Sequence, residues 1–396
     1  MKRWPTKSLE QIAELFGGST PSRNNPAFWN GEIPWATPTD LPMPDEGISV
    51  VSQTKDRITE VGLENSGTVV VPKGTVLFSS RATIGKVAVA DMPLTTNQGF
   101  ANFVPRSEIS SRFLAYTLWH RREDIARLSG STTFKEVSRS TLRKYEIPVP
   151  PLAEQERIAK LLDEANELRK LRAHADRRTA EFIPALFHKM FGDPIRSPRG
   201  VPVVRVDQAG RVQLGRQRSP KYQTGKFTRP YVRVANVFED RIDVSDLLSM
   251  DFDERDFQQY QLEHGDILLN EGQSTELVGR PAMWRNEVSN CCFQNTLLRF
   301  QPNREKVLPD FALSLFLTYF RAGEFAKLSG KTSSIAHLGA GRFAKMPFII
   351  PPMPLQKTFA ARVKEIRELE TAQARSRARL DALFAALLDK AFKGEL

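Results

Sequence analysis

Cysteine is the scarcest of the reactive residues in this chain of 396 amino acids. The two cysteines, Cys291 and Cys292, are adjacent, and adjacent cysteines rarely form a structural disulfide or supply metal-ligand spacing. We therefore expect a reducing compartment and no structural zinc site. The histidines are too scattered for the paired ligands of a zinc protease; they are His120, His174, His188, His264 and His337.

Long apolar runs are also missing. A transmembrane helix needs about 18 consecutive apolar residues, and the sequence contains no such run. The first residues, Met1–Phe16, lack the apolar core of a signal peptide. Hydrophobic residues make up 40% of the chain, which is enough to fill folded cores, and the length suits two or more domains. We expect a cytoplasmic protein with no membrane partner.

Catalytic motifs are the third absence. Gly225-Lys226 lacks the upstream glycine and the following hydroxyl residue of a phosphate-binding loop, and no Glu-x-Lys or Asp-x-Lys nuclease motif occurs. Asn25–Phe28 reads Asn-Pro-Ala-Phe and differs from the Asn-Pro-Pro-Phe motif of amino-methyltransferases, so we interpret it as a turn. The acidic run Asp251–Asp256 fits a metal site or a solvated turn, and we favour the turn. We predict a chain without a catalytic site.

The central stretch, Pro151–Gly192, has the pattern of one long amphipathic helix. Its apolar residues recur at steps of three and four, and Gly192 with Pro194 would end the helix. About 38 helical residues at ~1.5 Å each would give a rod of ~57 Å, a length typical of a coiled-coil partner. Pro184 should bend or break the last turns, because proline removes a backbone hydrogen bond.

The stretch occurs twice. Pro354–Leu396 aligns with it without a gap at a shift of 201 positions, so that Gln155 falls on Gln356 and Phe191 on Phe392. Two unrelated surface helices are the alternative, but gapless agreement of core positions favours a duplication. Polar residues interrupt both apolar stripes in the middle, which predicts pairing that is tight at the ends and polar at the centre; they are Arg172, Thr179, Glu370, Gln373 and Arg377.

The segments before the two helices repeat as well. Each mixes short strands with helices, which indicates an α+β fold. Glycines mark the repeat, since Gly74 pairs with Gly265 and Gly85 with Gly279. We divide the chain into 1–150, a central helix at 151–192, a second mixed domain at 193–350, and a C-terminal helix at 351–396.

The chain is basic, with 57 Lys and Arg against 46 Asp and Glu and a net charge of +11. This balance favours a polyanionic partner. The densest cluster, Gln208–Phe238, contains seven basic residues and no acidic one, interleaved with aromatic residues. Such loops suit phosphate and base contacts, although a solvated basic loop without a ligand has the same composition.

Several motifs resemble those of the DNA-specificity subunit of type I restriction–modification enzymes. The matching stretches are Gly17–Ser22, Ile33–Trp35, Gly74–Lys86, Asn97–Gly99, Ile147–Asp163 and Leu387–Leu396. The second half departs from the family pattern, because Glu271–Leu277 replaces its Ser-Arg-Ala-Thr motif and the neighbourhood of Gly18 has no clean copy.

The resemblance implies a fold and a set of partners. Residues 1–150 and 193–350 would be target-recognition domains, each reading one half of a bipartite double-stranded DNA sequence. The helices at 151–192 and 351–396 would pack as an antiparallel coiled coil that spaces them. The chain would be non-catalytic and would bind two methyltransferase subunits and, in the full enzyme, two restriction/translocase subunits. S-adenosylmethionine, Mg²⁺ and ATP would belong to those partners, with no cofactor in this chain.

The resemblance also directs the choice of DNA-contacting residues. We assign phosphate contacts to Lys135, Lys144, Arg216, Arg218, Lys221, Lys226 and Lys331. Base readers need Arg, Asn or Gln for bidentate pairing, so we nominate Arg81, Arg139, Arg233 and Asn236. Further candidate cations are Arg23 and Lys86. The alternative function is a coiled-coil adaptor whose basic loops bind no DNA.

Overall fold

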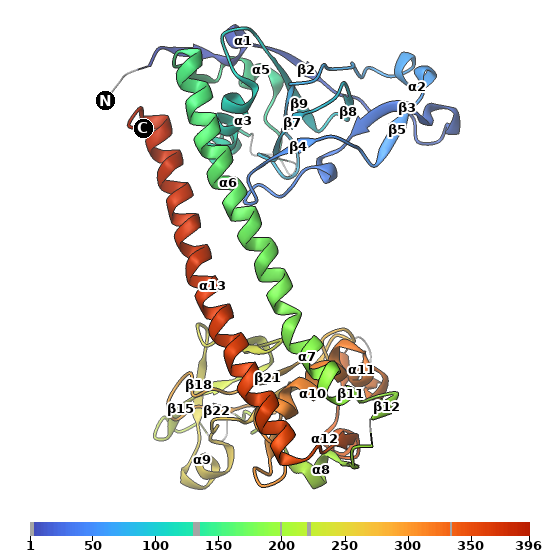
Figure 1. Ribbon diagram of the computed structural model, residues 1–396, viewed down its shortest axis with the longest axis vertical. Coiled ribbons are helices and arrows are strands. Elements are labelled where there is room, and N and C mark those ends of the chain that lie inside the picture. Colours follow the sequence, from blue (N-terminus) through green and yellow to red (C-terminus); the bar gives the residue numbers. More distant parts are fainter. Residues whose placement is uncertain (1–3, 130–134, 199, 220–222, 333–334) are drawn as a thin grey trace. The chain divides into compact units, whose positions relative to one another are not determined.

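The computed structural model describes residues 4–129, 135–198, 200–219, 223–332 and 335–396 (Figure 1). The chain forms two compact units. Unit 1 combines Met1–Ala173 with Arg375–Leu396, and unit 2 is His174–Ala374. Each unit therefore contains one mixed domain together with part of both long helices, so the units cut across the four segments drawn from the sequence. No helix in the described part of the chain is long and apolar enough to cross a membrane.

Unit 1 is built on a mixed sheet with the strand order β2-β9-β6-β7-β4. These strands are Ala13–Gly17 (β2), Phe100–Pro105 (β9), Val76–Ser79 (β6), Val87–Ala90 (β7) and Ile48–Val51 (β4). A smaller sheet and one strand pair accompany it: Asp56–Ile58 (β5), Trp29–Ala36 (β3) and Thr95–Thr96 (β8), and Thr6–Ser8 (β1) with Glu146–Pro148 (β10). The helices are Leu9–Ile12 (α1), Glu60–Glu64 (α2), Ser111–His120 (α3), Arg122–Arg127 (α4) and Arg139–Lys144 (α5), with one-turn helices at Pro26–Phe28 and Pro38–Asp40.

The main sheet of unit 1 is covered on both faces. Along β6, Val76 and Phe78 join the core that also contains α3, whereas Leu77 joins a second core. This alternation follows from the two-residue period of a strand. All four residues of β6 are buried, which is why the strand reads as a continuous apolar run rather than as an alternating one.

Unit 2 repeats this architecture on a sheet with the strand order β14-β23-β19-β21. Its strands are Gly210–Leu214 (β14), Leu297–Pro302 (β23), Ile267–Asn270 (β19) and Pro281–Met283 (β21). The other strands are Gly192–Asp193 (β11), Ser197–Pro198 (β12), Val203–Arg205 (β13), Thr228–Val232 (β15), Val237–Phe238 (β16), Arg241–Ile242 (β17), Leu248–Asp251 (β18), Gly272–Gln273 (β20), Cys292–Phe293 (β22), Gly330–Thr332 (β24), Ile335–His337 (β25) and Pro347–Ile349 (β26). The helices are Phe182–Phe191 (α7), Val206–Ala209 (α8), Glu254–Tyr260 (α9), Pro309–Arg321 (α10), Glu324–Leu328 (α11) and Ala340–Ala344 (α12), with a one-turn helix at Val234–Asn236.

The strand registers confirm the duplication. In unit 1, β2 pairs with β9 so that Ala13 lies opposite Pro105; in unit 2, β14 pairs with β23 so that Gly210 lies opposite Pro302. Both units also contain a short parallel pair, β3 with β8 and β15 with β22. The paired glycines agree too, because Gly74, Gly265, Gly85 and Gly279 all have positive φ.

The long helices are Leu152–Ala180 (α6) and Met353–Lys393 (α13), and they pack antiparallel within each unit. In unit 1 the beginning of α6 meets the end of α13, where Ile158 and Leu162 share a core with Phe384 and Leu388. In unit 2 Phe187 of α7 contacts Phe359 of α13, with ring centroids 5.8 Å apart. The antiparallel pairing predicted from the resemblance is thus confirmed in both units.

Polar pairs occupy the middle of these helices, as the interrupted stripes predict. In unit 1, Arg169 Nε lies 2.7 Å from Asp381 Oδ1. In unit 2, the Gln373 amide donates to the Thr179 hydroxyl at 3.0 Å, and Thr179 is buried. In each unit a polar contact, an ion pair or a hydrogen bond, therefore joins the two helices where apolar contacts between them are sparse.

The predicted break near Pro184 is also confirmed. Helix α6 ends at Ala180 and α7 begins at Phe182, which places Pro184 in the first turn of α7. Proline is tolerated there because the first-turn N–H groups have no partner within the helix. Its counterpart Ala385 lies inside α13, which is continuous.

Candidate nucleic-acid interface

Four segments of unit 1 converge at one end of its main sheet. Strands β2 and β6 end there, whereas β7 and β9 begin there. Three backbone hydrogen bonds join the segments: Ser19 N to Thr96 O at 3.0 Å, Ser80 N to Gly99 O at 2.8 Å, and Val137 N to Ser80 O at 3.0 Å. We call residues 18–23, 80–85, 97–99 and 135–139 the first loop edge.

Unit 2 makes the same three hydrogen bonds. They are Arg216 N to Phe293 O at 3.1 Å, Glu271 N to Thr296 O at 2.9 Å, and Leu338 N to Glu271 O at 2.8 Å. We call residues 215–219, 271–279, 294–296 and 335–338 the second loop edge. The two loop edges therefore share these three backbone hydrogen bonds although their sequences differ.

Glycines at matching positions permit the tight backbone approach at both edges. A β-carbon on Gly18 would lie 2.2 Å from Asn97 O, and one on Gly215 would lie 2.2 Å from Gln294 O. Gly215 is thus the copy of Gly18, which corrects the expectation that this neighbourhood has none. The equivalence is not visible in the sequence, because the residues around the two glycines differ: Gly-Gly-Ser-Thr in unit 1 corresponds to Leu-Gly-Arg-Gln in unit 2.

The first loop edge brings together several of the predicted cations. Arg81 Nη2 lies 2.8 Å from Glu136 Oε2, and both side chains are partly exposed. Lys135 is exposed beside them, and its carbonyl accepts from Ala82 N at 3.3 Å. The Arg139 guanidinium packs against Gly17, where an added β-carbon would lie 2.1 Å from Nη1. Lys144 is exposed at the other end of α5, away from this group.

Arg23 is held in a fixed position on the same edge. Its Nη2 lies 2.7 Å from Asp56 Oδ2. Its guanidinium carbon lies 3.8 Å from the ring centroid of Trp29 and 5.1 Å from that of Trp35. A stacked and ion-paired arginine that remains more than half exposed is pre-organised to meet a ligand.

Two predicted residues have structural roles instead. Lys86 is 8% exposed, and its ammonium donates to the carbonyls of Pro38 at 2.8 Å and Leu41 at 3.2 Å. Asn236 is 2% exposed, and its amide group bonds to backbone on either side of its turn, accepting from Arg233 N and donating to Asp243 O at 3.0 Å. Because their polar atoms bind backbone, we leave both out of the proposed DNA-contacting set.

The remaining candidates of unit 2 differ in accessibility. Arg216 is largely buried in an ion pair with Asp256, and Arg233 is paired with Asp246 at 2.6 Å. Arg218 and Lys226 are exposed. Lys221 lies outside the described residues, and for Lys331, on β24, only the backbone is described.

Asp251 holds the loop that carries Lys226. It is 4% exposed, so the solvated turn expected from the sequence is wrong at this residue. Its carboxylate accepts from the hydroxyls of Thr224 at 2.9 Å and Thr228 at 3.0 Å and from Gly225 N at 2.6 Å. Burial opposes ionisation, but these hydrogen bonds outweigh it and lower the pKa of Asp251 to about 2.

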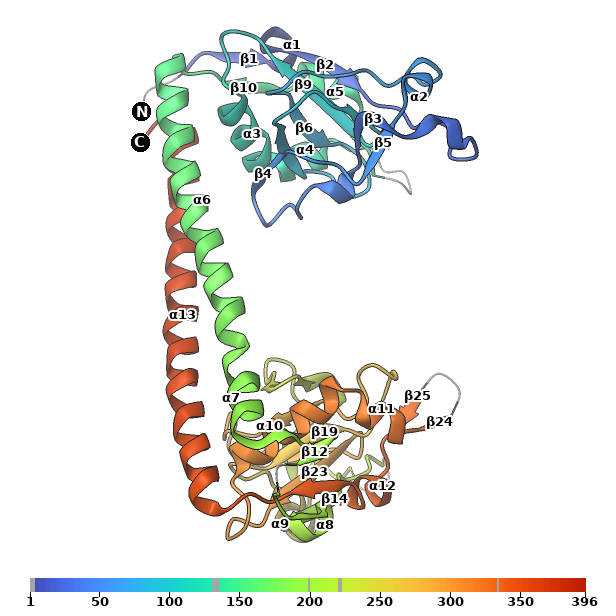
Figure 2. The same cartoon turned by 45° about the vertical axis from the view of Figure 1, so that its right-hand side comes forward.

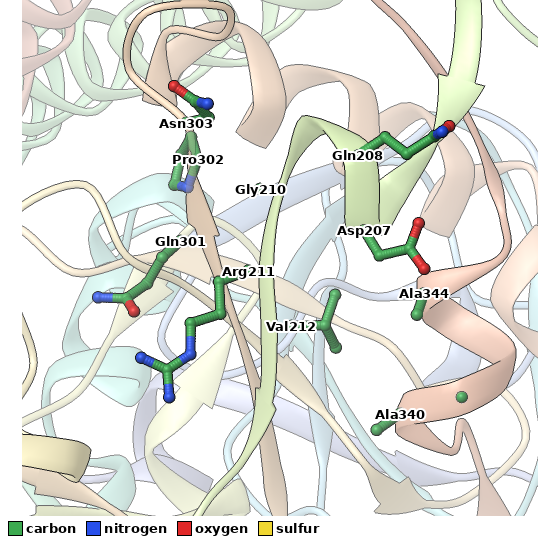
Figure 3. Close-up of a pocket in the computed structure, with 11 residues that line it drawn as sticks. Asp207, Gln208, Gly210, Arg211, Val212, Gln301, Pro302, Asn303, Ala340 and Ala344 are labelled. Atoms are coloured by element: carbon green, nitrogen blue, oxygen red, sulfur yellow. The ribbon is translucent and has the colours of Figure 1, made fainter.

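A groove of about 860 Å³ lies at the ends of β14 and β23 that are farther from the second loop edge. It is bounded by β14, β23, α8 and α12, and Figure 3 shows Arg211 and Gln301 on its neighbouring strands. Arg211 was part of the basic cluster, but β14 carries it away from the second loop edge. The groove is therefore separate from the candidate interface.

Sequence reasoning missed a polar pair on the second loop edge. His337 Nδ1 lies 3.0 Å from Glu271 Oε2. The pair joins two segments that are 66 positions apart, and Glu271 begins the stretch that departs from the family pattern. The sequence contained no signal for it, since only the pairing of β20 with β25 brings these residues together.

Comparisons with known proteins agree with this architecture. Residues 1–174 match the family model described as the type I restriction modification DNA specificity domain. The type I restriction enzyme MjaIX specificity subunit of Methanocaldococcus jannaschii is 34% identical over 256 residues, which cover 60% of this chain and 58% of that protein. The match thus spans somewhat more than half the length of this relative.

Two solved structures share the fold. A chain described under complex assembly and conformational transition of the type I R-M system is 17% identical, with a TM-score of 0.62 and coverage of 100% and 99% of the two chains. The type I restriction-modification S subunit from M. genitalium is 14% identical, with a TM-score of 0.57 and coverage of 98% and 96%. Residues 1–174 are thus similar to the type I restriction modification DNA specificity domain, and the chain as a whole shares the fold of two type I restriction–modification chains.

Proposed function

We propose that this chain is the sequence-specific DNA-binding subunit of a type I restriction–modification complex. It reads a bipartite target in double-stranded DNA and provides the scaffold for two methyltransferase subunits, and in a full restriction enzyme for two restriction/translocase subunits. It performs no chemistry itself. S-adenosylmethionine, Mg²⁺ and ATP are the cofactors of the partner subunits.

The observation that carries this proposal is the duplicated loop edge. Each unit holds its edge with the same backbone hydrogen bonds and the same close-packed glycine, Gly18 or Gly215, yet the side chains on the two edges differ. A scaffold that is repeated while its exposed side chains vary suits two readers of different half-sites. The helices common to both units would set the distance between those half-sites.

The exposed cations of each unit support DNA as the ligand. Arg23, Arg81, Lys135 and Arg139 lie on the first loop edge, and Arg218 belongs to the second. Lysine and arginine contacts to phosphates displace condensed counterions and thereby provide most of the affinity for DNA. Arginine also reads guanine through two parallel hydrogen bonds.

Exposed apolar residues on the long helices support the protein partners. Leu168 is 52% exposed and its counterpart Leu369 is 43% exposed, and Phe182 and its counterpart Leu383 are exposed as well. Both pairs are separated by 201 positions. Apolar side chains on otherwise charged helices favour a protein contact. Because each occurs in both copies of the repeat, the pattern suits two copies of one partner.

Co-expression with a methyltransferase subunit, followed by selection from DNA duplexes with random sequence, tests the proposal. We expect the complex to retain one bipartite motif with a fixed gap. A complex that forms without any sequence preference would instead identify a coiled-coil adaptor. Selection with the methyltransferase subunit alone is the control, and it should recover no bipartite motif.

A further inference from the structure

The two loop edges differ in strand pairing at one equivalent position. In unit 1, Arg81 forms an isolated bridge with Glu136. In unit 2 the corresponding segment is longer and forms β20, which pairs with β25 so that Gly272 lies opposite His337. Strand β25 also pairs with β24, so the three strands form a sheet in the order β20-β25-β24. We call β24 and β25 the ribbon, and it lies at the margin of unit 2 (Figure 2).

The His337 ring is fixed by two neighbours. Nδ1 lies 3.0 Å from Glu271 Oε2, and a carboxylate oxygen at this distance suits the tautomer in which Nδ1–H donates to it. Within the described residues Nε2 has no hydrogen-bond partner. A β-carbon on Gly272 would lie 3.2 Å from His337 Cε1, so the ring packs against the glycine.

Ile335 is the second side chain on this face of the ribbon. Ile335 and His337 are two residues apart on β25, with the buried Ala336 between them, so they share the opposite face. Ile335 is 47% exposed, and the His337 side chain is 42% exposed. An exposed branched apolar residue beside an oriented imidazole has no role in the cores of unit 2.

We propose that Ile335 and His337 read bases in the half-site of the second unit, an assignment that rests on the proposed function. The major groove of B-DNA, about 12 Å wide, admits a two-stranded ribbon. Ile335 contacts the methyl group of a thymine, and His337 Nε2 accepts a hydrogen bond from the exocyclic amino group of an adenine or cytosine. Glu271 acts as a positioning residue that fixes the ring.

The first edge implies a different reading. Arg81 presents a guanidinium at the position equivalent to Gly272, and guanidinium groups pair with guanine. The two half-sites should therefore differ in base composition at the equivalent position. Variants of Arg81 provide the matched control for variants of the ribbon.

Base analogues in the selected target test the thymine contact in the complex with the methyltransferase subunit. Replacing each thymine of the second half-site by uracil removes only a methyl group. At one position we expect the affinity of the wild-type complex to fall about fourfold, the value of one buried methyl-sized group. The affinity of Ile335→Ala should not change on that replacement.

A second analogue tests His337. Purine in place of adenine, or pyrimidin-2-one in place of cytosine, removes the exocyclic amino group. At one position the affinity of wild type for the analogue should be about tenfold lower than for the natural base, as expected for a lost hydrogen bond of ~1.4 kcal/mol. His337→Ala should bind the analogue and the natural base at that position with equal affinity. Glu271→Gln keeps an acceptor oxygen and should retain the preference, whereas Glu271→Leu and Gly272→Ala should weaken it at the same base.

The remaining outcomes separate this inference from the proposed function. Arg81→Ala should change the preference only in the other half-site. If wild type selects a bipartite motif and the Ile335 and His337 variants keep it unchanged or lose affinity equally for all sequences, base reading by the ribbon is overturned alone. If the variants lose the methyltransferase subunit but keep their base preference, the ribbon is a protein contact. If wild type selects no motif, both proposals are overturned.

Discussion

Gln155 and Gln356 lie 201 positions apart and make the same hydrogen bonds, one in each unit. The Gln155 side chain is completely buried at the beginning of α6. Its amide oxygen accepts from Ser110 N at 2.8 Å, and its amide nitrogen donates to the carbonyls of Glu108 at 2.9 Å and Pro150 at 2.8 Å.

Gln356 repeats this arrangement at the beginning of α13. It accepts from Leu308 N at 2.9 Å and donates to the carbonyls of Lys306 at 2.9 Å and Pro351 at 2.8 Å. Each glutamine thus joins the first turn of a long helix to the loop before α3 or α10. The bonds fix each mixed domain to its helix.

We expect Gln155→Ala to destabilise unit 1 by about 3 kcal/mol, because it leaves buried backbone groups without partners. Gln356→Ala should have a similar effect on unit 2. Unfolding in urea, followed with a probe in each unit, measures both. The exposed Gln217 is the control, and its replacement by alanine should cost less than about 0.5 kcal/mol. Equal stability of the Gln155 variant and wild type would contradict the assigned role.

Arg81→Ala should relax the base preference at one position of the first half-site. A lost bidentate contact to guanine corresponds to about 1–3 kcal/mol of discrimination. Binding to a panel of duplexes with single substitutions measures this effect. A uniform loss of affinity at every position would show that Arg81 contacts phosphate instead.

Lys226→Ala should weaken DNA binding about equally for all sequences and reduce the salt slope by roughly one. The reason is that an exposed lysine on the loop held by Asp251 suits a phosphate contact. Binding measured between low and high salt tests it. Lys86→Met is the matched comparison, since it should reduce stability and leave the salt slope unchanged.

The contribution of Asp251 to stability should depend on pH. Its pKa in the folded chain is about 2, below the ~3.9 of an unfolded aspartate. The stabilisation is therefore fully present above pH ~4 and is lost as the pH falls towards ~2. Unfolding of wild type and Asp251→Asn between pH 5 and pH 2 should show a difference that shrinks with acidity. A difference that stays constant across this range would argue against the hydrogen-bonded carboxylate.

Leu168→Glu combined with Leu369→Glu should prevent both methyltransferase subunits from binding, and either single change should leave one bound. A charged residue at the centre of an apolar contact loses the burial energy and must be desolvated. The mass of the purified complex distinguishes two, one and no partners. The control is Leu128→Glu, which changes a similarly exposed leucine at the C-terminal end of α4 and should leave both methyltransferase subunits bound.

The long helices could be predicted because their information is local. A period of 3.6 residues, an uninterrupted repeat and one proline are enough to place α6, α7 and α13 to within a few residues. The break before α7 follows from Pro184 in the same way. Helical periodicity survives wherever one face of a helix is buried.

The loop edges could be predicted only in part, because their geometry depends on pairing between distant segments. Lysine and asparagine often contact DNA, but Lys86 and Asn236 are buried, and their polar atoms form hydrogen bonds with backbone carbonyl groups. Gly215 was hidden by unlike neighbours. Glu271 and His337 are brought together by the pairing of β20 with β25, which no local sequence pattern predicts.

The order in which the units are completed follows from their composition. Unit 2 is one continuous segment, whereas unit 1 needs Arg375–Leu396 for its core, where Phe392 contacts Phe113 and His120 with ring centroids 5.7 and 4.8 Å apart. During synthesis at about 5–20 residues per second, unit 2 can therefore close while unit 1 still waits for its last helix turns. A chain cut short before Arg375 would keep a complete second unit, while its first unit would have an open apolar core, a state that chaperones and proteases recognise.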